Sequence, residues 1–278
     1  MTHGDEVHEH DRGLSHDLPT LLSRRRALAL LGGAGVAALA ACGTGSTTEP
    51  STGSAGTGSA GTGSATTSAA AGSQIPQETA GPYPADGSNG VNVLTESGIV
   101  RSHITRGFGS ASGVAAGVPL TIKLTVLDIK NGAAALEGAA VYLWHCDRDG
   151  KYSLYSDGLT GENYLRGVQE TDGSGAVTFT SIYPAAYSGR WPHIHFEVYP
   201  SLAKATTASE KLRTSQLALP EDASRLVYGT DGYSTSVGNL AQTSLDTDNV
   251  FSDGYSLQLA TVTGTVEQGL TATLTVPV

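Results

Sequence analysis

Hydrophobic and polar residues alternate along several short stretches of the chain. In residues 120–126, apolar side chains at every second position are separated by Thr and Lys. This period of two is typical of a β-strand with one face in a core. Five more stretches combine such alternation with β-branched or aromatic residues, and we expect strands there as well: 139–145, 177–182, 193–199, 257–262 and 270–276. Residues 209–219 fit either a short helix or a strand.

Clusters of turn-forming residues separate these stretches. They include Asn131-Gly132, Asp149-Gly150 and the run Asp-Gly-Ser-Gly at 172–175. Short strands divided by Gly-rich turns at such spacings are typical of a β-sandwich. We therefore predict an all-β fold, with one β-sandwich domain over residues 75–278.

The N-terminal residues have the pattern of an export signal. Arg24, Arg25 and Arg26 precede an uncharged apolar run at 27–41, which is shorter than the about 20 residues of a transmembrane helix. A basic region, a short apolar region and small residues before a cleavage point describe a secretory signal. We predict that residues 1–41 are a signal peptide and that the protein is exported and extracytoplasmic.

Two features refine this prediction. Residues 23–28 resemble a twin-arginine signal, and Leu-Ala-Ala-Cys at 39–42 resembles a bacterial lipobox. The lipobox implies that Cys42 carries a lipid that anchors the protein to the cell membrane. The alternative is an ordinary cleaved signal with an incidental Cys.

Residues 42–74 are mostly Gly, Ser, Thr and Ala. A stretch without large apolar side chains cannot form a core and stays a flexible coil. We predict a disordered linker that holds the following domain away from the membrane.

Composition excludes several classes of protein. Lys and Arg number 16 against 26 Asp and Glu, so nucleic acid is not the expected partner, because phosphate binding needs clustered cations. With 2 Cys, the chain has neither a disulfide framework nor a Cys-rich zinc module. With 15% charged residues and 36 Gly, it does not have the composition of a helical bundle.

The candidate chemistry of the domain lies in its His and Tyr residues. His193 and His195 are two positions apart in an expected strand, so both point to one face with Glu197 and could bind one metal ion. A purely structural pair is the alternative. All 11 Tyr follow residue 82, and a phenolate is a hard anionic donor that suits a highly charged ion such as Fe(III). Spacing alone leaves the metal and its remaining ligands open.

Several segments resemble the intradiol ring-cleavage dioxygenases. They are Gly-Lys-Tyr-Ser at 150–153, Pro-Ala-Ala-Tyr at 184–187 and Arg-Trp-Pro-His-Ile-His-Phe at 190–196, with upstream matches at 78–83 and 141–146. The resemblance spans about residues 76–218. It implies a β-sandwich enzyme with mononuclear non-haem Fe(III), which converts catechols and O2 to cis,cis-muconates.

The resemblance also implies roles for individual residues. The iron ligands would be Tyr152, Tyr187, His193 and His195, with Tyr187 displaced when a catechol dianion binds. Arg190 would stabilise anionic character on the bound substrate, and Gln216 would lie near the same pocket. Gly81, Pro82 and Tyr83 would line the entrance for the substrate.

Two other functions remain open at this point. Residues 120–187 also resemble transthyretin-like surface modules, which are non-catalytic β-sandwiches. A degenerate dioxygenase could bind aromatics or metal without turnover. The identity of the catechol is open, and a homo-oligomer is possible.

Other conspicuous residues receive structural interpretations. We expect residues 147–150 to form a turn rather than a calcium loop, and Cys146 to pack as a small apolar residue. His103 and His145 are expected to be structural. Asp246, Asp248 and Asp253 are expected to form a solvated acidic loop.

Overall fold

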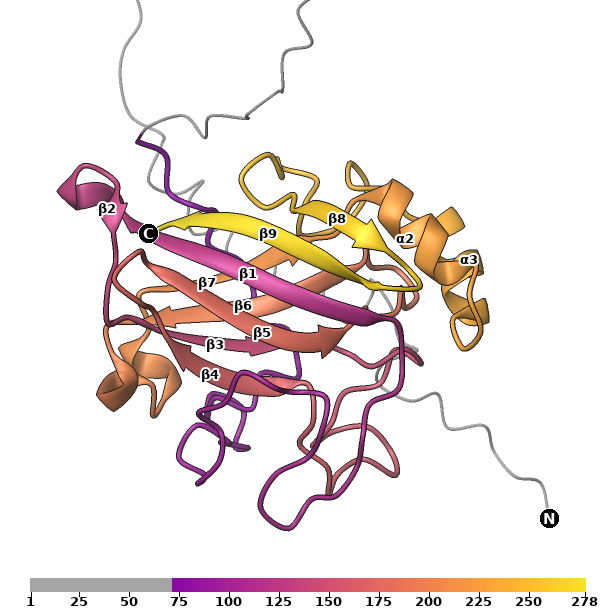
Figure 1. Ribbon diagram of the computed structural model, residues 1–278, viewed down its shortest axis with the longest axis horizontal. Coiled ribbons are helices and arrows are strands. Elements are labelled where there is room, and N and C mark those ends of the chain that lie inside the picture. Colours follow the sequence, from indigo (N-terminus) through magenta and orange to yellow (C-terminus); the bar gives the residue numbers. More distant parts are fainter. Residues whose placement is uncertain (1–71) are drawn as a thin grey trace, which may run out of the picture. The chain divides into compact units, whose positions relative to one another are not determined.

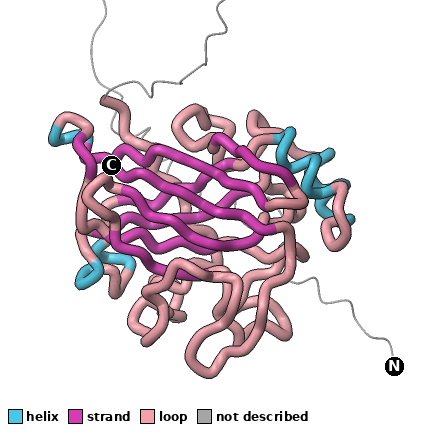
Figure 2. The backbone as a smooth tube through the Cα atoms, viewed as in Figure 1, coloured by secondary structure: helices cyan, strands magenta, loops and turns pink. Residues whose placement is uncertain are grey.

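Two β-sheets face each other in the computed structural model, which describes residues 72–278 (Figures 1 and 2). One sheet has five strands: β1 (Pro119–Asp128), β2 (Ala134–Ala135), β5 (Ala176–Ile182), β8 (Thr261–Thr265) and β9 (Gly269–Pro277). The other has four: β3 (Ala140–Trp144), β4 (Arg166–Glu170), β6 (His193–Tyr199) and β7 (Arg213–Ala218). The predicted all-β sandwich is confirmed. The expected signal, Cys42 and the linker up to residue 71 lie outside the described residues.

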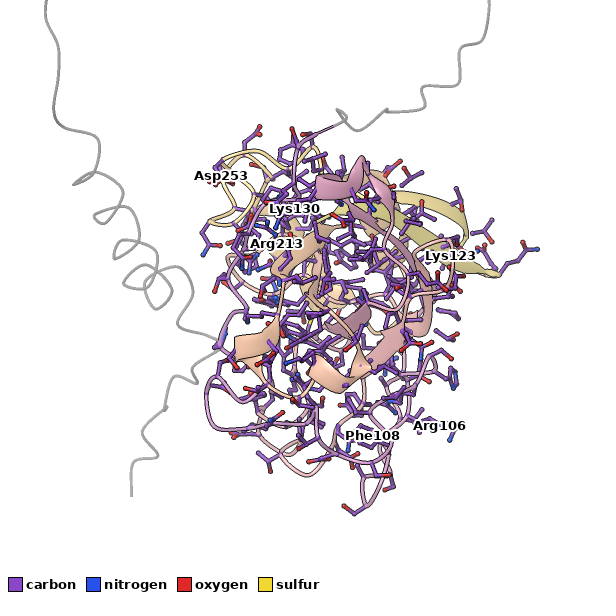
Figure 3. The ribbon with its side chains drawn as sticks, turned by 90° about the vertical axis from the view of Figure 1, so that its left-hand side faces the viewer. Arg106, Phe108, Lys123, Lys130, Arg213 and Asp253 are labelled. Carbon is purple, nitrogen blue, oxygen red and sulfur yellow. The ribbon has the colours of Figure 1, made fainter. Side chains whose placement is uncertain are left out.

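Strand β1 is central to the larger sheet. It pairs antiparallel with β5 and parallel with β9, while β8 extends the sheet beyond β9. Its buried residues alternate with more exposed ones, so Ile122 and Leu124 face inward while Lys123 points into solvent (Figure 3). The alternation predicted for residues 120–126 is therefore present.

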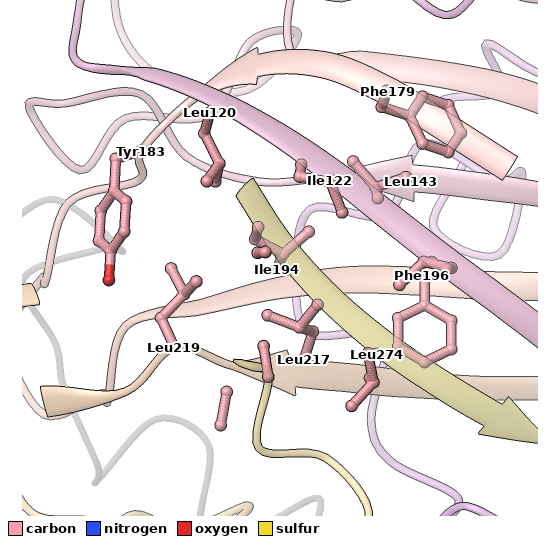
Figure 4. Packing of buried hydrophobic residues seen from close by; sticks show 14 of the residues in the cluster. Leu120, Ile122, Leu143, Phe179, Tyr183, Ile194, Phe196, Leu217, Leu219 and Leu274 are labelled. Carbon is pink, nitrogen blue, oxygen red and sulfur yellow. The ribbon is translucent and has the colours of Figure 1, made fainter. Parts of the chain in front are cut away.

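The core lies between the two sheets (Figure 4). Ile122 and Phe179 of the larger sheet are buried in the same cluster as Phe196 of the smaller one. Each such side chain contributes about 1.5–3 kcal/mol when it is fully removed from water.

The smaller sheet is buried on both faces. Its strands lie in the order β4-β3-β6-β7, and all pairs are antiparallel. A second apolar cluster covers the face that points away from the core, where Ala85, Val93 and Ile99 pack with Tyr142 and Trp144 of β3. Side chains on this outer face of β6 therefore lie under a layer formed by the segment that precedes β1.

The structure differs from the prediction in the C-terminal part. The segment 209–219 is divided between a 3-10 turn at Ala208–Glu210 and strand β7. The strand expected at 257–262 begins later, at Thr261. Helices α2 (Glu221–Tyr228) and α3 (Ser234–Ala241) were not predicted. No helix in residues 72–278 is long and apolar enough to span a membrane.

Candidate metal centre

Strand β6 presents His193 and His195 on the face that is turned away from the core. The intervening Ile194 points between the sheets, as the alternation predicts. Neighbouring strands flank the pair on both sides, because His195 lies opposite Trp144 of β3 and Gln216 of β7. The Trp144 ring stacks on the His195 ring, with centroids 4.9 Å apart.

All four predicted ligands converge at this position. The Tyr187 hydroxyl is 3.2 Å from His193 Nε2, which is 3.1 Å from His195 Nε2. The Tyr152 ring centroid is 6.1 Å from that of Tyr187 and 6.3 Å from that of His195. Tyr152, His193 and His195 are buried, and Tyr187 is partly exposed.

The hydrogen bonds of His193 fix its tautomer. Its Nδ1 lies 2.5 Å from the carbonyl oxygen of Trp191 and must donate, because a carbonyl only accepts. A neutral ring then presents its lone pair at Nε2, toward Tyr187 and His195. Burial lowers the pKa of both imidazoles well below the usual range, and the positive charge of Arg190 lowers both further.

The two phenols are placed in a way that suits a cation. Burial raises the pKa of Tyr152 and of Tyr187 above the usual value for a phenol. The Tyr152 hydroxyl is buried and forms no hydrogen bond of standard geometry, which is costly for a polar group without another partner. A metal ion would use this oxygen as a ligand and would stabilise the ionised phenol. Two phenol oxygens and two imidazole nitrogens are a donor set that fits Fe(III).

No group of three or more His, Cys, Asp or Glu within residues 72–278 could hold a metal ion. The further candidate ligands beside His193 and His195 are the phenols of Tyr152 and Tyr187.

Arg190 lies beside this cluster and is almost fully buried. Its Nε donates to Asp248 Oδ2 at 3.0 Å, and its Nη2 donates to Gln216 Oε1 at 2.7 Å. Gln216 Nε2 donates in turn to the Thr79 carbonyl oxygen at 3.0 Å. The structure thus brings both predicted residues, Arg190 and Gln216, into one network.

Of the three residues predicted to line the entrance, Gly81 and Tyr83 lie at the cluster. Gly81 has a φ of 70°, and a Cβ at this position would be 3.4 Å from His195 Cε1. Pro82 is exposed. The Tyr83 ring centroid lies 4.8 Å from that of Tyr152.

The expectation for Asp248 is wrong. Its side chain is fully buried and ion-paired with Arg190, whereas Asp246 and Asp253 are exposed as expected. A local cluster of acidic residues predicts side chains exposed to solvent, but Asp248 pairs with Arg190, a cation 58 positions away in the chain. The only local hint is the apolar pair Val250-Phe251 immediately after it.

Sequence reasoning also missed Arg166, which is 1% exposed. Its guanidinium donates to Ser153, the neighbour of Tyr152, and to the Tyr83 carbonyl oxygen. The expectations for Cys146 and His145 are confirmed, whereas His103 is exposed. Cys146 packs in an apolar cluster, and His145 bonds the Cys146 carbonyl oxygen and the Ser181 hydroxyl.

Comparison with known proteins gives one family match. Residues 105–194 match the family model described as Dioxygenase. This segment includes Tyr152, Tyr187 and His193 and ends just before His195. No curated protein matches the chain.

Solved structures extend the likeness to the whole sandwich. The intradiol ring-cleavage dioxygenase from Tetranychus urticae is 23% identical with a TM-score of 0.57, and the alignment covers 74% of this chain and 94% of that one. The dioxygenase Tetur07g02040 is also 23% identical, with a TM-score of 0.58 over 74% of this chain and 93% of that one. The fold is that of the intradiol dioxygenases, and a fold alone does not determine a reaction.

Proposed function

We propose that the protein is a non-haem Fe(III) intradiol dioxygenase that cleaves catecholic aromatics with O2 to cis,cis-muconate-type products. The observation that carries the proposal is the convergence of Tyr152, Tyr187, His193 and His195 on one buried point. A non-catalytic sandwich has no need for such a cluster. The cluster buries two imidazoles and a phenol hydroxyl that forms no hydrogen bond of standard geometry, which costs stability.

The four side chains would hold one Fe(III) ion. When bound, the ion would ionise both phenols and accept the oxygens of a catecholate, which prepares the ring for attack by O2. The protein contributes a fixed set of ligands. His193 is oriented by the Trp191 carbonyl oxygen, and His195 is held between Trp144 and Gly81.

Arg190 supplies positive charge beside the ligands. An anionic substrate is costly to bury away from water unless a fixed cation or hydrogen-bond donor lies close to it. The guanidinium is held in place by Asp248 and Gln216 before any substrate arrives. It is thus preorganised to stabilise the negative charge that a catecholate brings into the site.

Water is largely excluded from the ligand face. The segment that carries Gly81 and Tyr83 covers this side of β6, and Tyr83 packs against both Tyr152 and Tyr155. Exclusion of water strengthens every charge interaction in the site. Tyr187 is the most exposed ligand, which suits its proposed displacement by the incoming catechol.

The test is oxygen consumption by the iron-loaded protein with a panel of catechols, followed by identification of the product. We expect uptake of O2 and a ring opened between the two hydroxylated carbons, with both atoms of labelled O2 in the product. Tyr187→Phe should reduce turnover strongly. The matched control is Tyr228→Phe, because the Tyr228 hydroxyl donates to the Pro184 carbonyl oxygen and to none of the four candidate ligands.

Three results would contradict the proposal. Absence of oxygen uptake with every catechol would favour a non-catalytic module or a degenerate homologue. A product opened beside the two hydroxylated carbons would indicate a different reaction. Equal losses in Tyr187→Phe and Tyr228→Phe would remove the special role of Tyr187.

We further propose that this reaction takes place outside the cytoplasmic membrane, with the protein anchored through a lipid on Cys42. The basic-apolar pattern of residues 24–41 and the Leu-Ala-Ala-Cys sequence support this location. Mass spectrometry of the N-terminal peptide from membrane fractions should find acylated Cys42. Cys42→Ser should release the protein from the membrane, and unchanged membrane association would contradict the anchor.

A further inference from the structure

Asp248 is a buried carboxylate in the segment between α3 and β8, outside the strands that carry the ligands. Its Oδ2 accepts from Arg190 Nε at 3.0 Å and from the Trp191 backbone N–H at 2.7 Å. Its Oδ1 accepts from the backbone N–H groups of Val250 at 2.8 Å and Phe251 at 3.2 Å. Arg190 Nη2 also lies 3.5 Å from Oδ1.

The two oxygens have separate tasks. Oδ1 fixes the carboxylate to its own segment through the turn at Val250 and Phe251. Oδ2 is thereby held at a defined position, where it bonds both the side chain of Arg190 and the backbone of Trp191. Because the carboxylate has no access to water, each of these bonds is formed in a low-dielectric interior, where it is strong.

The Trp191 peptide carries this anchoring to a ligand. Its N–H donates to Asp248, and its carbonyl oxygen accepts from His193 Nδ1. The orientation of the His193 ring depends on that carbonyl, as the orientation of a metal-bound imidazole commonly depends on its second hydrogen bond. Asp248 therefore acts on two groups of the site, the Arg190 guanidinium and the His193 imidazole.

Gln216 completes the arrangement from the other side. It accepts from Arg190 Nη2 and donates to Thr79, whose hydroxyl accepts from the Gly81 N–H. The guanidinium is thus held between β7 and the C-terminal segment. Burial lowers the pKa of Arg190, but the carboxylate of Asp248 raises it and the net shift is upward, so this residue stays charged.

We propose that Asp248 is a positioning residue that holds Arg190 and, through the Trp191 peptide, His193 in the geometry needed for a bound catecholate. This role rests on the proposed function for its effect on turnover, although the anchoring itself can be measured without any reaction. Asp248 lies outside the matched segment 105–194, so the C-terminal part of this chain completes a site whose ligands come from β6 and the loops before it.

The deciding variant is Asp248→Asn, which keeps the size of the side chain but replaces one oxygen by an NH2 group. That group cannot accept the bonds that now reach one of the two oxygens. The matched control is Asp246→Asn, which makes the same change in charge at an exposed position two residues away. Thermal unfolding of both variants verifies that they fold.

The first readout is hydrogen exchange in the metal-free, ¹⁵N-labelled protein. We expect exchange of the Arg190 Nε–H and the Trp191 amide to accelerate about tenfold or more in Asp248→Asn, because a lost bond opens both groups. Asp246→Asn should match the unaltered protein. Unchanged exchange in Asp248→Asn would overturn the anchoring, whatever the enzyme does.

The second readout is turnover of the iron-loaded variants. Misplacement of a charged group by about 1 Å can cost on the order of 100-fold in rate, so we expect kcat of Asp248→Asn to fall by about that factor while iron content is retained. If hydrogen exchange in Asp248→Asn is faster but its kcat stays within twofold of the unaltered protein, Asp248 has only a structural role. That result would overturn the positioning role. If the unaltered iron-loaded protein shows no turnover, the proposed function is overturned. The hydrogen-exchange rates of Arg190 and Trp191 would then still show whether Asp248 anchors these two groups.

Asp248→Glu covers the case in which Asp248→Asn does not fold. It keeps the negative charge but lengthens the side chain by one methylene, so the bonds to Arg190 and to Val250 cannot both keep their lengths. We expect faster exchange at Arg190 together with a lower kcat. Full retention of kcat despite faster exchange at Arg190 would contradict the proposal, and so would unchanged exchange.

Discussion

Arg166 is a buried cation whose hydrogen bonds are all to neutral groups, which makes its contribution to stability measurable. It is 1% exposed and begins strand β4. Its three nitrogens make five hydrogen bonds, to the Ser153 hydroxyl and carbonyl oxygen, the Pro84 and Tyr83 carbonyl oxygens and the Tyr142 hydroxyl. These bonds join the segment that covers the site to the loop that carries Tyr152.

Arg166→Met removes the charge and all five bonds. Each acceptor that remains buried without a partner costs about 1–3 kcal/mol. The variant no longer buries a charge, which offsets several kcal/mol of this loss. We expect a net loss of about 3–4 kcal/mol in the free energy of unfolding, near the upper end for single substitutions. For a domain of this size, that is a fall in Tm of roughly 10 °C.

The assay is denaturant unfolding of the metal-free protein, followed by circular dichroism. The control is Arg106→Met, because Arg106 is exposed at the surface (Figure 3) and its replacement should change stability by no more than about 0.5 kcal/mol. If the free energy of unfolding of Arg166→Met lies within 1 kcal/mol of that of the unaltered protein, the five hydrogen bonds do not hold the covering segment in place.

Three further changes have defined outcomes. Gly81→Ala places a Cβ 3.4 Å from His195 Cε1 on a backbone with φ of 70°. The resulting strain of about 1–2 kcal/mol should lower kcat/KM about tenfold in oxygen-uptake assays. Unchanged kinetics would show that Gly81 does not lie beside the substrate. Tyr152→Phe removes a buried hydroxyl that forms no hydrogen bond of standard geometry. The metal-free protein should therefore gain about 1 kcal/mol of stability while its Fe(III) affinity falls, and a loss of stability in urea unfolding would show that the hydroxyl forms a stabilising bond in the folded protein. Burial, with the charge of Asp253, raises the pKa of Glu78 from 4.5 to about 7. The neutral form is thus favoured in the folded state, and the contribution of Glu78 to stability is full below pH 4.5 and lost as pH rises through about 7. Glu78→Gln should therefore raise Tm more at about pH 8 than at about pH 5, and an equal change at both would contradict the shifted pKa.

The parts of the fold that the sequence predicted are those in which alternation records burial directly. Strand β6 was placed at its observed bounds, and β1 and β9 within two residues, because one face of each packs in the core. Strand β4 was missed because it begins with a buried Arg and continues with Gly167, so it lacks the apolar alternation. The proximity of the four candidate ligands was predicted, because the His193–His195 spacing places two imidazoles on one face and the family resemblance adds Tyr152 and Tyr187.

The surroundings of the four candidate ligands could not be predicted in the same way. Asp248 and Arg166 are charged residues in the interior, and their burial depends on partners far away in the chain. From the local sequence, such charged residues are predicted to be exposed to solvent. Only the folded chain brings up the opposite charge or the carbonyl oxygens that offset the cost of burying them. The network around a site is therefore the part that required the structure.

The central claim is that Tyr152, Tyr187, His193 and His195 hold Fe(III). The most direct measurement is the iron content and visible spectrum of the purified protein after loading with Fe(III). We predict one iron per chain and a red-brown tyrosinate-to-iron absorption that weakens in Tyr152→Phe and is retained in Tyr228→Phe. A protein that takes up no iron, or that binds iron without this colour, would contradict the account.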